Sequence, residues 1–269
     1  MSDGSDLAWL GLERDGDRSW SFELTPELTR PDGKLYGGTG IAVAIAAMEA
    51  ETARDTLWTT VQFVSSADVG DRISCGVEVL AAGRRTSQVR ITATVGDRVV
   101  LAALGATGLA RDGGMQVQVG EMPDAGDPAD AGPWGSTSSF RPAEGASWFA
   151  IAELRQAETA DDRYAMWARM RSMPQTRATI AFLADMVPSA VVRAGGRMGG
   201  GTSLDNSARF GPEPAAGTEW ILLDFDPYLA EGGYLHGGAR IWSPDGTLLG
   251  VASQTAAEMV WPVSDQLTR

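Results

Sequence analysis

One stretch of the chain, residues 35–53, limits the possible folds more than any other segment does. Its residues are apolar or small on nearly every side of a helical wheel, and the first charged side chain, Glu49, comes near its end. A helix without a polar face is usually buried. Gly37, Gly38 and Gly40 stand at its start, where backbone can approach a neighbour or a ligand closely. This segment therefore predicts a central helix that the rest of the chain must surround.

Strand-like segments lie on both sides of this predicted helix. They alternate apolar and polar residues or are rich in β-branched residues, and Gly96 and Asp97 mark a tight turn between two of them. The predicted strands are 20–24, 56–64, 72–80, 86–95 and 98–106, after an irregular lead-in over residues 1–18. A buried helix followed by an antiparallel meander predicts an α+β unit in which a sheet wraps around the helix.

The second half of the chain repeats this order of elements. Two predicted strands, 147–155 and 164–171, precede a largely buried helix over 174–193, in which Pro188 predicts a kink or an end. Four more strands are predicted at 203–210, 220–225, 234–242 and 248–261. We expect a Gly-rich stretch at 195–201 to be a mobile loop that could act as a lid. The repeat predicts a duplicated unit whose two sheets could pair into one.

The composition of residues 108–139, rich in Gly, Pro, Asp and Ser, predicts a linker between the two units. We therefore expect an N-terminal unit over residues 1–110, a linker over 111–144 and a C-terminal unit over 145–269.

The net charge of −13 argues against a general nucleic-acid or anionic-membrane surface, because both partners are polyanions. A single cysteine, Cys75, and a single histidine, His236, leave no disulfide framework and no Cys/His metal cluster. The sequence shows no signal peptide and no apolar run of membrane-spanning length. We therefore expect a cytoplasmic protein without a metal or other cofactor.

Four motifs resemble those of one known family. They are LYGGTGIAVAIAAM at residues 35–48, AFLADM at 181–186, TSLDNSARF at 202–210 and DGTLLGVASQ at 245–254. Their order and spacing resemble the double hot-dog acyl-CoA thioesterases of the bacterial acyl-CoA thioesterase II type. The resemblance implies a double hot-dog fold, an acyl-CoA substrate and a homo-oligomer. It also implies that Asp185, Ser203 and Gln254 together position and activate the attacking water.

The chain departs from the family pattern at three places. Ala184 precedes Asp185 where the family commonly has Ser, and Asn206 follows Asp205 where the family often has His. The strand at 57–63 lacks the histidine of the family's aromatic-rich strand. These departures leave the three implied site residues in place but put the substrate preference and the activity in question.

The chemistry of thioester hydrolysis suits these residue types. A carboxylate such as Asp185 can accept a proton from water, and a hydroxyl and an amide can fix the geometry of acid and water. Backbone N–H groups near Gly37 and Gly38, at a helix N-terminus, could bind the substrate and its developing oxyanion. Six arginines could meet the phosphates of coenzyme A, although solvated strand faces explain them equally well: Arg84, Arg85, Arg90, Arg169, Arg171 and Arg177.

Other interpretations remain open from the sequence. The fold could hold acyl-CoA or an acyl chain without hydrolysing it, or act as an enoyl-CoA hydratase, although that chemistry usually relies on an Asp/His pair. Serine-hydrolase and dinucleotide-binding motifs are absent. Asp185 could be a helix cap, Gly37 and Gly38 a tight helix entry, His236 a surface or packing residue and Cys75 a core residue.

Overall fold

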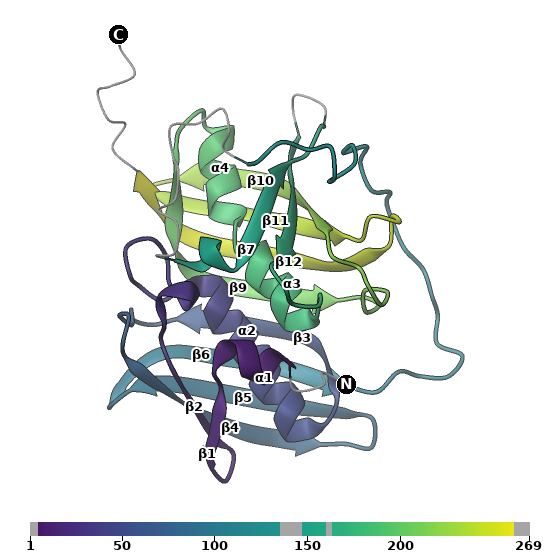
Figure 1. Ribbon diagram of the computed structural model, residues 1–269. Helices are drawn as coiled ribbons and strands as arrows, with labels where there is room; N and C mark the ends of the chain where they lie inside the picture. The colour runs from purple at the N-terminus through teal and green to yellow at the C-terminus, as the bar shows by residue number, and fades with distance from the viewer. Residues whose placement is uncertain (1–4, 135–146, 160–162, 261–269) are drawn as a thin grey trace.

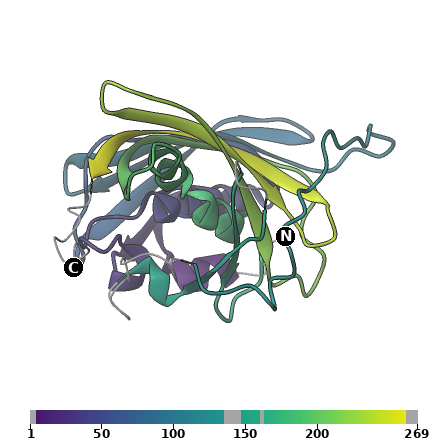
Figure 2. The same cartoon turned by 90° about the horizontal axis from the view of Figure 1, so that it is seen from above.

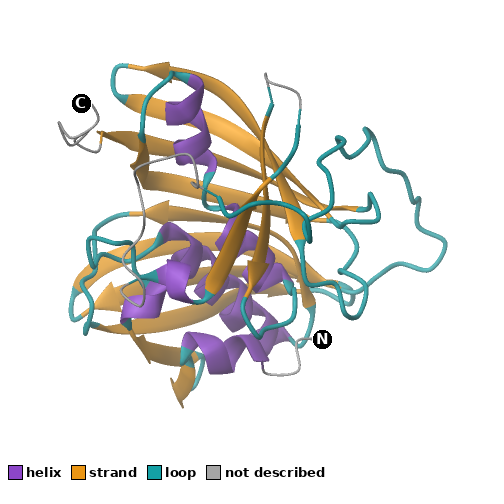
Figure 3. Ribbon diagram, turned by 45° about the horizontal axis from the view of Figure 1, so that its top comes forward, coloured by secondary structure: helices purple, strands orange, loops and turns teal. Residues whose placement is uncertain are grey.

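The structure, a computed structural model, describes residues 5–134, 147–159 and 163–260. The strands in these ranges form one antiparallel sheet of twelve strands, which curves around the helices (Figure 1 and Figure 2). All the helices lie on the concave side of this sheet, as Figure 3 shows. The α+β double hot-dog architecture expected from the sequence is therefore confirmed.

In each half of the chain, two strands precede the main helical segment and four strands follow it. The strands of the first half are β1 (Glu13–Gly16), β2 (Ser19–Glu23), β3 (Asp55–Phe63), β4 (Arg72–Ala82), β5 (Thr86–Val95) and β6 (Arg98–Gly108). Those of the second half are β7 (Ala152–Gln156), β8 (Tyr164–Met170), β9 (Gly199–Phe210), β10 (Ile221–Glu231), β11 (Tyr234–Trp242) and β12 (Leu248–Val260). The helices are α1 (Ser5–Leu10), α2 (Gly37–Thr52), α3 (Arg177–Ala184) and α4 (Val187–Ala194), with 3-10 turns at Pro26–Leu28 and Trp148–Ala150.

The two halves of the chain meet at the middle of the sheet. The strand order is β1-β2-β4-β5-β6-β3 followed by β9-β12-β11-β10-β8-β7, so the β3–β9 pair joins the halves. Thr60 faces Ser207 in this pair, and their hydroxyl oxygens are 2.6 Å apart. One continuous sheet therefore carries the helices of both halves.

The predicted central helix is α2. Every residue from 37 to 49 is buried, and Ile41, Ile45 and Met48 are completely excluded from solvent. The helix ends at Ala53, which takes a left-handed conformation with φ of 51° and donates its N–H to the Glu49 carbonyl. The sheet and α3 surround α2, as an apolar helix requires.

Three predictions about local structure were wrong. The described part of the expected lead-in, residues 5–18, is not irregular, because it contains α1 and β1, and Asp6 of α1 accepts hydrogen bonds from Trp9 and Thr176. The segment 147–155 begins as a 3-10 turn before β7 starts. The stretch expected as a mobile loop lies outside the strands only over residues 195–198, because β9 begins at Gly199, where a Cβ atom would lie 2.4 Å from the Met259 carbonyl oxygen.

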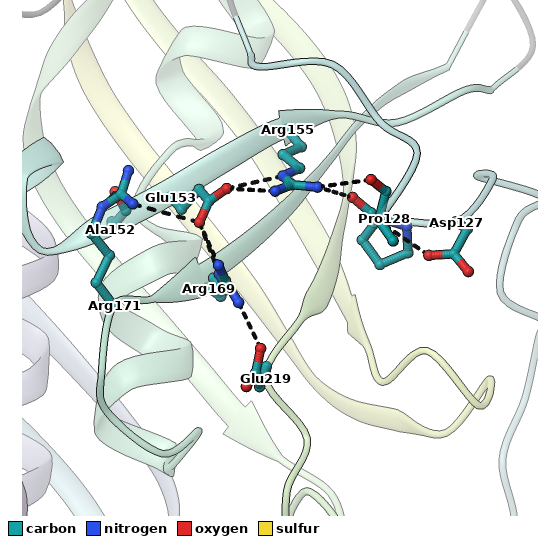
Figure 4. A network of polar contacts seen from close by, with 9 residues as sticks. Asp127, Pro128, Ala152, Glu153, Arg155, Arg169, Arg171 and Glu219 are labelled. Carbon is teal, nitrogen blue, oxygen red and sulfur yellow. Dashed lines mark hydrogen bonds and ion pairs between the residues drawn. The ribbon is translucent and has the colours of Figure 1, made fainter.

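The described part of the predicted linker, residues 111–134, contains no helix and no strand longer than a single bridge. Arg155 of β7 holds this segment by donating to the carbonyl oxygens of Pro128 and Ala129 at 2.6 and 3.1 Å (Figure 4). Arg155 and Arg169 both donate to Glu153, which holds this guanidinium network together (Figure 4). None of the helices in the described residues is long and apolar enough to cross a membrane.

Candidate active site

A break between two helices carries the predicted acid. Helix α3 begins with a capping box, in which Thr176 and Thr179 each accept from the other's backbone N–H. It ends at Ala184, and the Phe182 carbonyl in its last turn accepts a hydrogen bond from the Tyr36 hydroxyl at 3.1 Å. The sequence predicted a kink or an end at Pro188, but the helix breaks before this residue. Asp185 therefore lies between α3 and α4.

The start of α2 packs directly against this break. A Cβ atom on Gly38 would lie 2.4 Å from the Phe182 carbonyl oxygen, so only glycine allows the two helix ends to approach this closely. A Cβ atom on Gly37 would lie within 2.9 Å of both carboxylate oxygens of Asp185 and of the Ser203 hydroxyl. The two glycines therefore leave the space that the acid and the hydroxyl occupy.

The structure brings together the three residues predicted to activate water. Gln254 Nε2 donates to Asp185 Oδ1 and to Ser203 Oγ, both at 2.7 Å. The Gly38 N–H donates to Asp185 Oδ2 at 2.8 Å, so this amide holds the acid. The N–H of Gly37 has no hydrogen-bond acceptor within the described residues. The site thus gathers residues of α2, the α3–α4 break, β9 and β12.

One residue of this cluster was not identified from the sequence as part of the site. Asn206 Nδ2 donates to Asp185 Oδ1 at 2.8 Å. In a regular strand, Ser203 and Asn206 would point to opposite faces. The register of β9 against β12 shifts at Leu204, and this bulge turns both side chains toward the acid. The only signal in the sequence was the amide beside Asp205, where the family often has histidine.

Burial dominates the electrostatics of Asp185, whose residue is 7% exposed. Desolvation raises the pKa of its carboxyl to about 7, against the opposing hydrogen bonds from Asn206, Gly38 and Gln254 and the charge of Arg30. Burial also raises the pKa of Tyr36 well above its usual range, so this phenol stays neutral. Asp185 is therefore the group at this site that titrates near neutral pH.

Two cavities meet at the cluster. The larger, of about 410 Å³, reaches Asp185, Gly37 and Ser203. Its aromatic wall includes Trp148, which stacks on Tyr36 with ring centroids 4.6 Å apart and on Phe149 at 4.0 Å. The smaller, of about 190 Å³, also reaches Gly37 and Ser203. The acid therefore lies beside a largely apolar space of the size of a small ligand.

Several other candidates from the sequence lie elsewhere and are engaged in other contacts. Four of the six arginines pair with carboxylates: Arg90 with Glu78, Arg169 with Glu153 and Glu219, Arg171 with Glu153, and Arg177 with Glu213 and Asp55. His236 Nδ1 lies 3.3 Å from the Thr255 hydroxyl, and Cys75 is fully buried. Within the described residues, no group of three or more His, Cys, Asp or Glu side chains is placed to hold a metal ion.

Comparisons with known proteins identify the family of this chain. Residues 25–108 match the family model of the acyl-CoA thioesterase N-terminal domain, and residues 118–257 match that of the acyl-CoA thioesterase C-terminal domain. No curated protein sequence matches the chain.

Solved structures show the same fold over nearly the whole chain. A Novosphingobium aromaticivorans protein assigned to the thioesterases is 29% identical, with a TM-score of 0.83, and the match covers 93% of this chain and 98% of that one. The tesB protein of Mycobacterium avium subspecies paratuberculosis is 22% identical (TM-score 0.77; 96% and 100% covered). Acyl-CoA thioesterase II TesB2 of Mycobacterium marinum is 18% identical (TM-score 0.74; 96% and 99% covered).

The two family models together span β3 to β11 and most of β12, and every residue of the cluster around Asp185 lies within the matched ranges. The resemblance inferred from the four sequence motifs is thereby confirmed. The chain belongs to the acyl-CoA thioesterase family and is a thioester hydrolase.

Proposed function

We propose that the protein hydrolyses an acyl-CoA thioester to the free acid and coenzyme A with water that Asp185 positions and deprotonates. The observation that carries this proposal is a buried carboxylate with three fixed donors at the junction of two cavities. No metal or redox cofactor enters the reaction as we propose it.

The pattern of hydrogen bonds assigns different roles to the two carboxylate oxygens. Oδ1 accepts from both Asn206 and Gln254, whereas Oδ2 accepts only from Gly38 within the described residues. Oδ2 therefore keeps the capacity to accept a proton from water on the side of Gly37. Ser203 already accepts from Gln254, so its own hydroxyl proton can be donated to that water or to the thioester oxygen.

The Gly37 N–H is the candidate donor to the developing oxyanion. It belongs to the first turn of α2, where backbone donors lack intrahelical partners and the helix dipole favours negative charge. The sequence suggested both glycines as donors to the oxyanion, but the N–H of Gly38 already donates to Asp185. The proposed substrate contact at this point is thus a single backbone hydrogen bond.

The proposed reaction conserves atoms and charge. The water oxygen forms a bond to the thioester carbon while its proton moves to Asp185, and the carbonyl oxygen becomes the oxyanion. When the tetrahedral intermediate collapses, the carbon–sulfur bond breaks and the coenzyme A sulfur takes the proton from Asp185. A base with a pKa of about 7 is suited to accept and return a proton near neutral pH.

Replacement of the acid tests this proposal. Asp185→Asn removes the base, and we expect kcat for a panel of acyl-CoAs to fall by about 10²- to 10⁴-fold, measured by release of free thiol. Asp205→Asn is the matched control, because the Asp205 carboxylate accepts the backbone N–H of Thr255 and, within the described residues, makes no hydrogen bond to a side chain of the cluster. An unchanged rate in Asp185→Asn would contradict the mechanism. A parent protein that binds acyl-CoA without releasing thiol would instead be a non-catalytic binding protein.

We also propose, from the family resemblance, that chains associate as homo-oligomers in the cytoplasm. We further propose that each chain consists of an N-terminal unit over residues 1–110, a linker over 111–144 and a C-terminal unit over 145–269. Sedimentation velocity tests the association, since a single chain has a mass of 28.4 kDa.

A further inference from the structure

A third cavity, of about 350 Å³, adjoins the larger active-site cavity. The two share Trp134 and Ser189 as lining residues, so they lie directly beside each other. Its other lining residues include Arg163, Arg193 and Tyr164. The mechanism proposed above uses none of these side chains.

Helix α4 connects this cavity to the acid. Asp185 lies just before the helix, whereas Ser189 and Arg193 stand one turn apart within it and therefore on the same face. The axial rise from the start of α4 to Arg193 is about 9 Å. A flexible arm lying along this face could therefore reach from the cationic end of the helix to the carboxylate.

The charges of this cavity are unusual for an acidic protein. The chain carries a net charge of −13, yet the described lining of the cavity contains two arginines and no Asp or Glu. Arg193 makes no ion pair within the described residues. Arg163 is held by Asp224, to which it donates two hydrogen bonds of 2.9 Å. An exposed cation thus faces the cavity beside a second guanidinium of fixed orientation.

We infer that this cavity binds the phosphates of the nucleotide of coenzyme A, with the pantetheine arm running along α4 past Ser189 to Asp185. The inference rests on the proposed function and extends it to the recognition of the substrate. Arginine is the side chain best suited to bind phosphate oxygens, because its N–H groups match their geometry. A neighbouring aromatic ring, Trp134 or Tyr164, offers a surface for the adenine base.

A charge reversal with a matched control tests the inference. Arg193→Glu and Arg209→Glu change the net charge equally, and Arg209 is an exposed residue of β9 that lines none of the three cavities. Each variant is assayed with an acyl-CoA and with the N-acetylcysteamine thioester of the same acid, which lacks the nucleotide. We expect Arg193→Glu to lower the ratio of the two kcat/KM values by about tenfold or more, through KM for acyl-CoA. Arg209→Glu should leave this ratio at the parent value.

A second measurement does not depend on catalysis. Adenosine 3′,5′-bisphosphate is titrated into the parent protein and both variants by calorimetry, and we expect Arg193→Glu alone to weaken its binding by about tenfold or more. Because Arg193 also lies in the last turn of α4, where a cation favours the helix dipole, thermal unfolding of each variant is recorded as well.

The two proposals fail in different ways. If the protein hydrolyses acyl-CoA but Arg193→Glu and Arg209→Glu show the same ratio of kcat/KM values and the same affinity for the bisphosphate, the nucleotide site is overturned. Absence of hydrolysis for every thioester, combined with bisphosphate binding that depends on Arg193, would overturn the proposed reaction and support the site.

Discussion

At the scale of single residues, the environment of Asp185 decides what the site can do. An isolated buried carboxylate is costly, and the side-chain amides of Asn206 and Gln254 and the backbone N–H of Gly38 offset part of that cost. They do not offset all of it, since the pKa of Asp185 remains raised to about 7. A residue near half-ionisation at neutral pH makes activity and stability depend on pH in opposite directions.

The first prediction concerns Asn206, a positioning residue for the acid. Its hydrogen bond lowers the pKa of Asp185, which is about 7, so Asn206→Ala should move the midpoint of the pH–rate profile above that of the parent protein. The rate at high pH should be retained better than the rate at pH 7. The matched control is Ser207→Ala, which alters the neighbouring residue of β9 that contacts Thr60 instead. Equal midpoints in parent and Asn206→Ala would exclude this role.

The second prediction concerns stability. The folded-state pKa of Asp185, about 7, lies above the value of about 3.9 for an unfolded aspartate, so between these pH values the folded protein binds more protons. The free energy of unfolding of the parent should therefore fall, relative to Asp185→Asn, by about 2–4 kcal/mol as the pH rises from about 4 to about 8. Urea denaturation at a series of pH values measures the difference. A difference that does not vary with pH would mean that the carboxyl titrates alike in both states.

At the scale of elements, the contact between the N-terminus of α2 and the C-terminus of α3 builds the site. Tyr36 caps the Phe182 carbonyl and so supports the end of α3, Gly38 permits the close approach, and Gly37 leaves room for the acid. The aromatic–Gly–Gly motif thus has a separate physical reason at each position. The two elements are more than a hundred residues apart along the chain, yet their ends define one another.

The third prediction follows from this contact. Alanine in place of glycine usually stabilises a helix, but at Gly38 the added methyl group would meet backbone atoms of α3. We expect Gly38→Ala to lower the free energy of unfolding by about 1–3 kcal/mol and to reduce kcat, because the helix ends must separate. Gly132→Ala serves as the control, since its Cβ atom would meet nothing within 4 Å. Chemical denaturation that shows Gly38→Ala to be as stable as the parent would contradict the close packing.

At the scale of the whole molecule, the two halves are related by an approximate two-fold axis at the β3–β9 pair. The pairs of this seam are arranged symmetrically about Thr60 and Ser207, and the register of both strands shifts at a leucine, Leu57 in β3 and Leu204 in β9. The symmetry would allow two sites, but within the part of the chain that the structure describes, the acid, hydroxyl and side-chain amides of the cluster all come from the C-terminal half.

The other half lacks the amide of the cluster. Thr59 of β3 faces Gly105 of β6, whereas Asn206 of β9 faces Gln254 of β12 in the related place. A Cβ atom on Gly105 would lie 2.7 Å from the sulfur of Met48, so the core of the N-terminal half already fills this space. Duplication has therefore left one half to supply the acid, hydroxyl and amides and the other to supply the helix N-terminus.

The fourth prediction is a stoichiometry. We expect the Asp185→Asn variant to bind one equivalent of acyl-CoA per chain, because in the described residues only one such cluster forms, with its acid, hydroxyl and side-chain amides all from the C-terminal half. Calorimetric titration of this variant measures the number of sites without turnover. Two equivalents with similar affinity would show that the N-terminal half keeps a site of its own.

The amino-acid sequence by itself determined most of the elements of this protein and most of the residues at its site. Burial of α2 follows from apolar and small residues on all its faces, and the strands follow from alternation and turn residues. Both are local properties, which periodicity records. The four ordered motifs also selected Asp185, Ser203 and Gln254, because family motifs preserve residue types at matching positions.

Tertiary structure alone decided how these groups meet. Whether Asn206 faces Asp185 depends on a bulge in the pairing of β9 with β12, and whether Gly38 holds the acid depends on the approach of α2 to α3. The raised pKa of Asp185 arises from burial by both halves of the chain. Such features depend on contacts between distant segments, and no local pattern of residues encodes the distance between them.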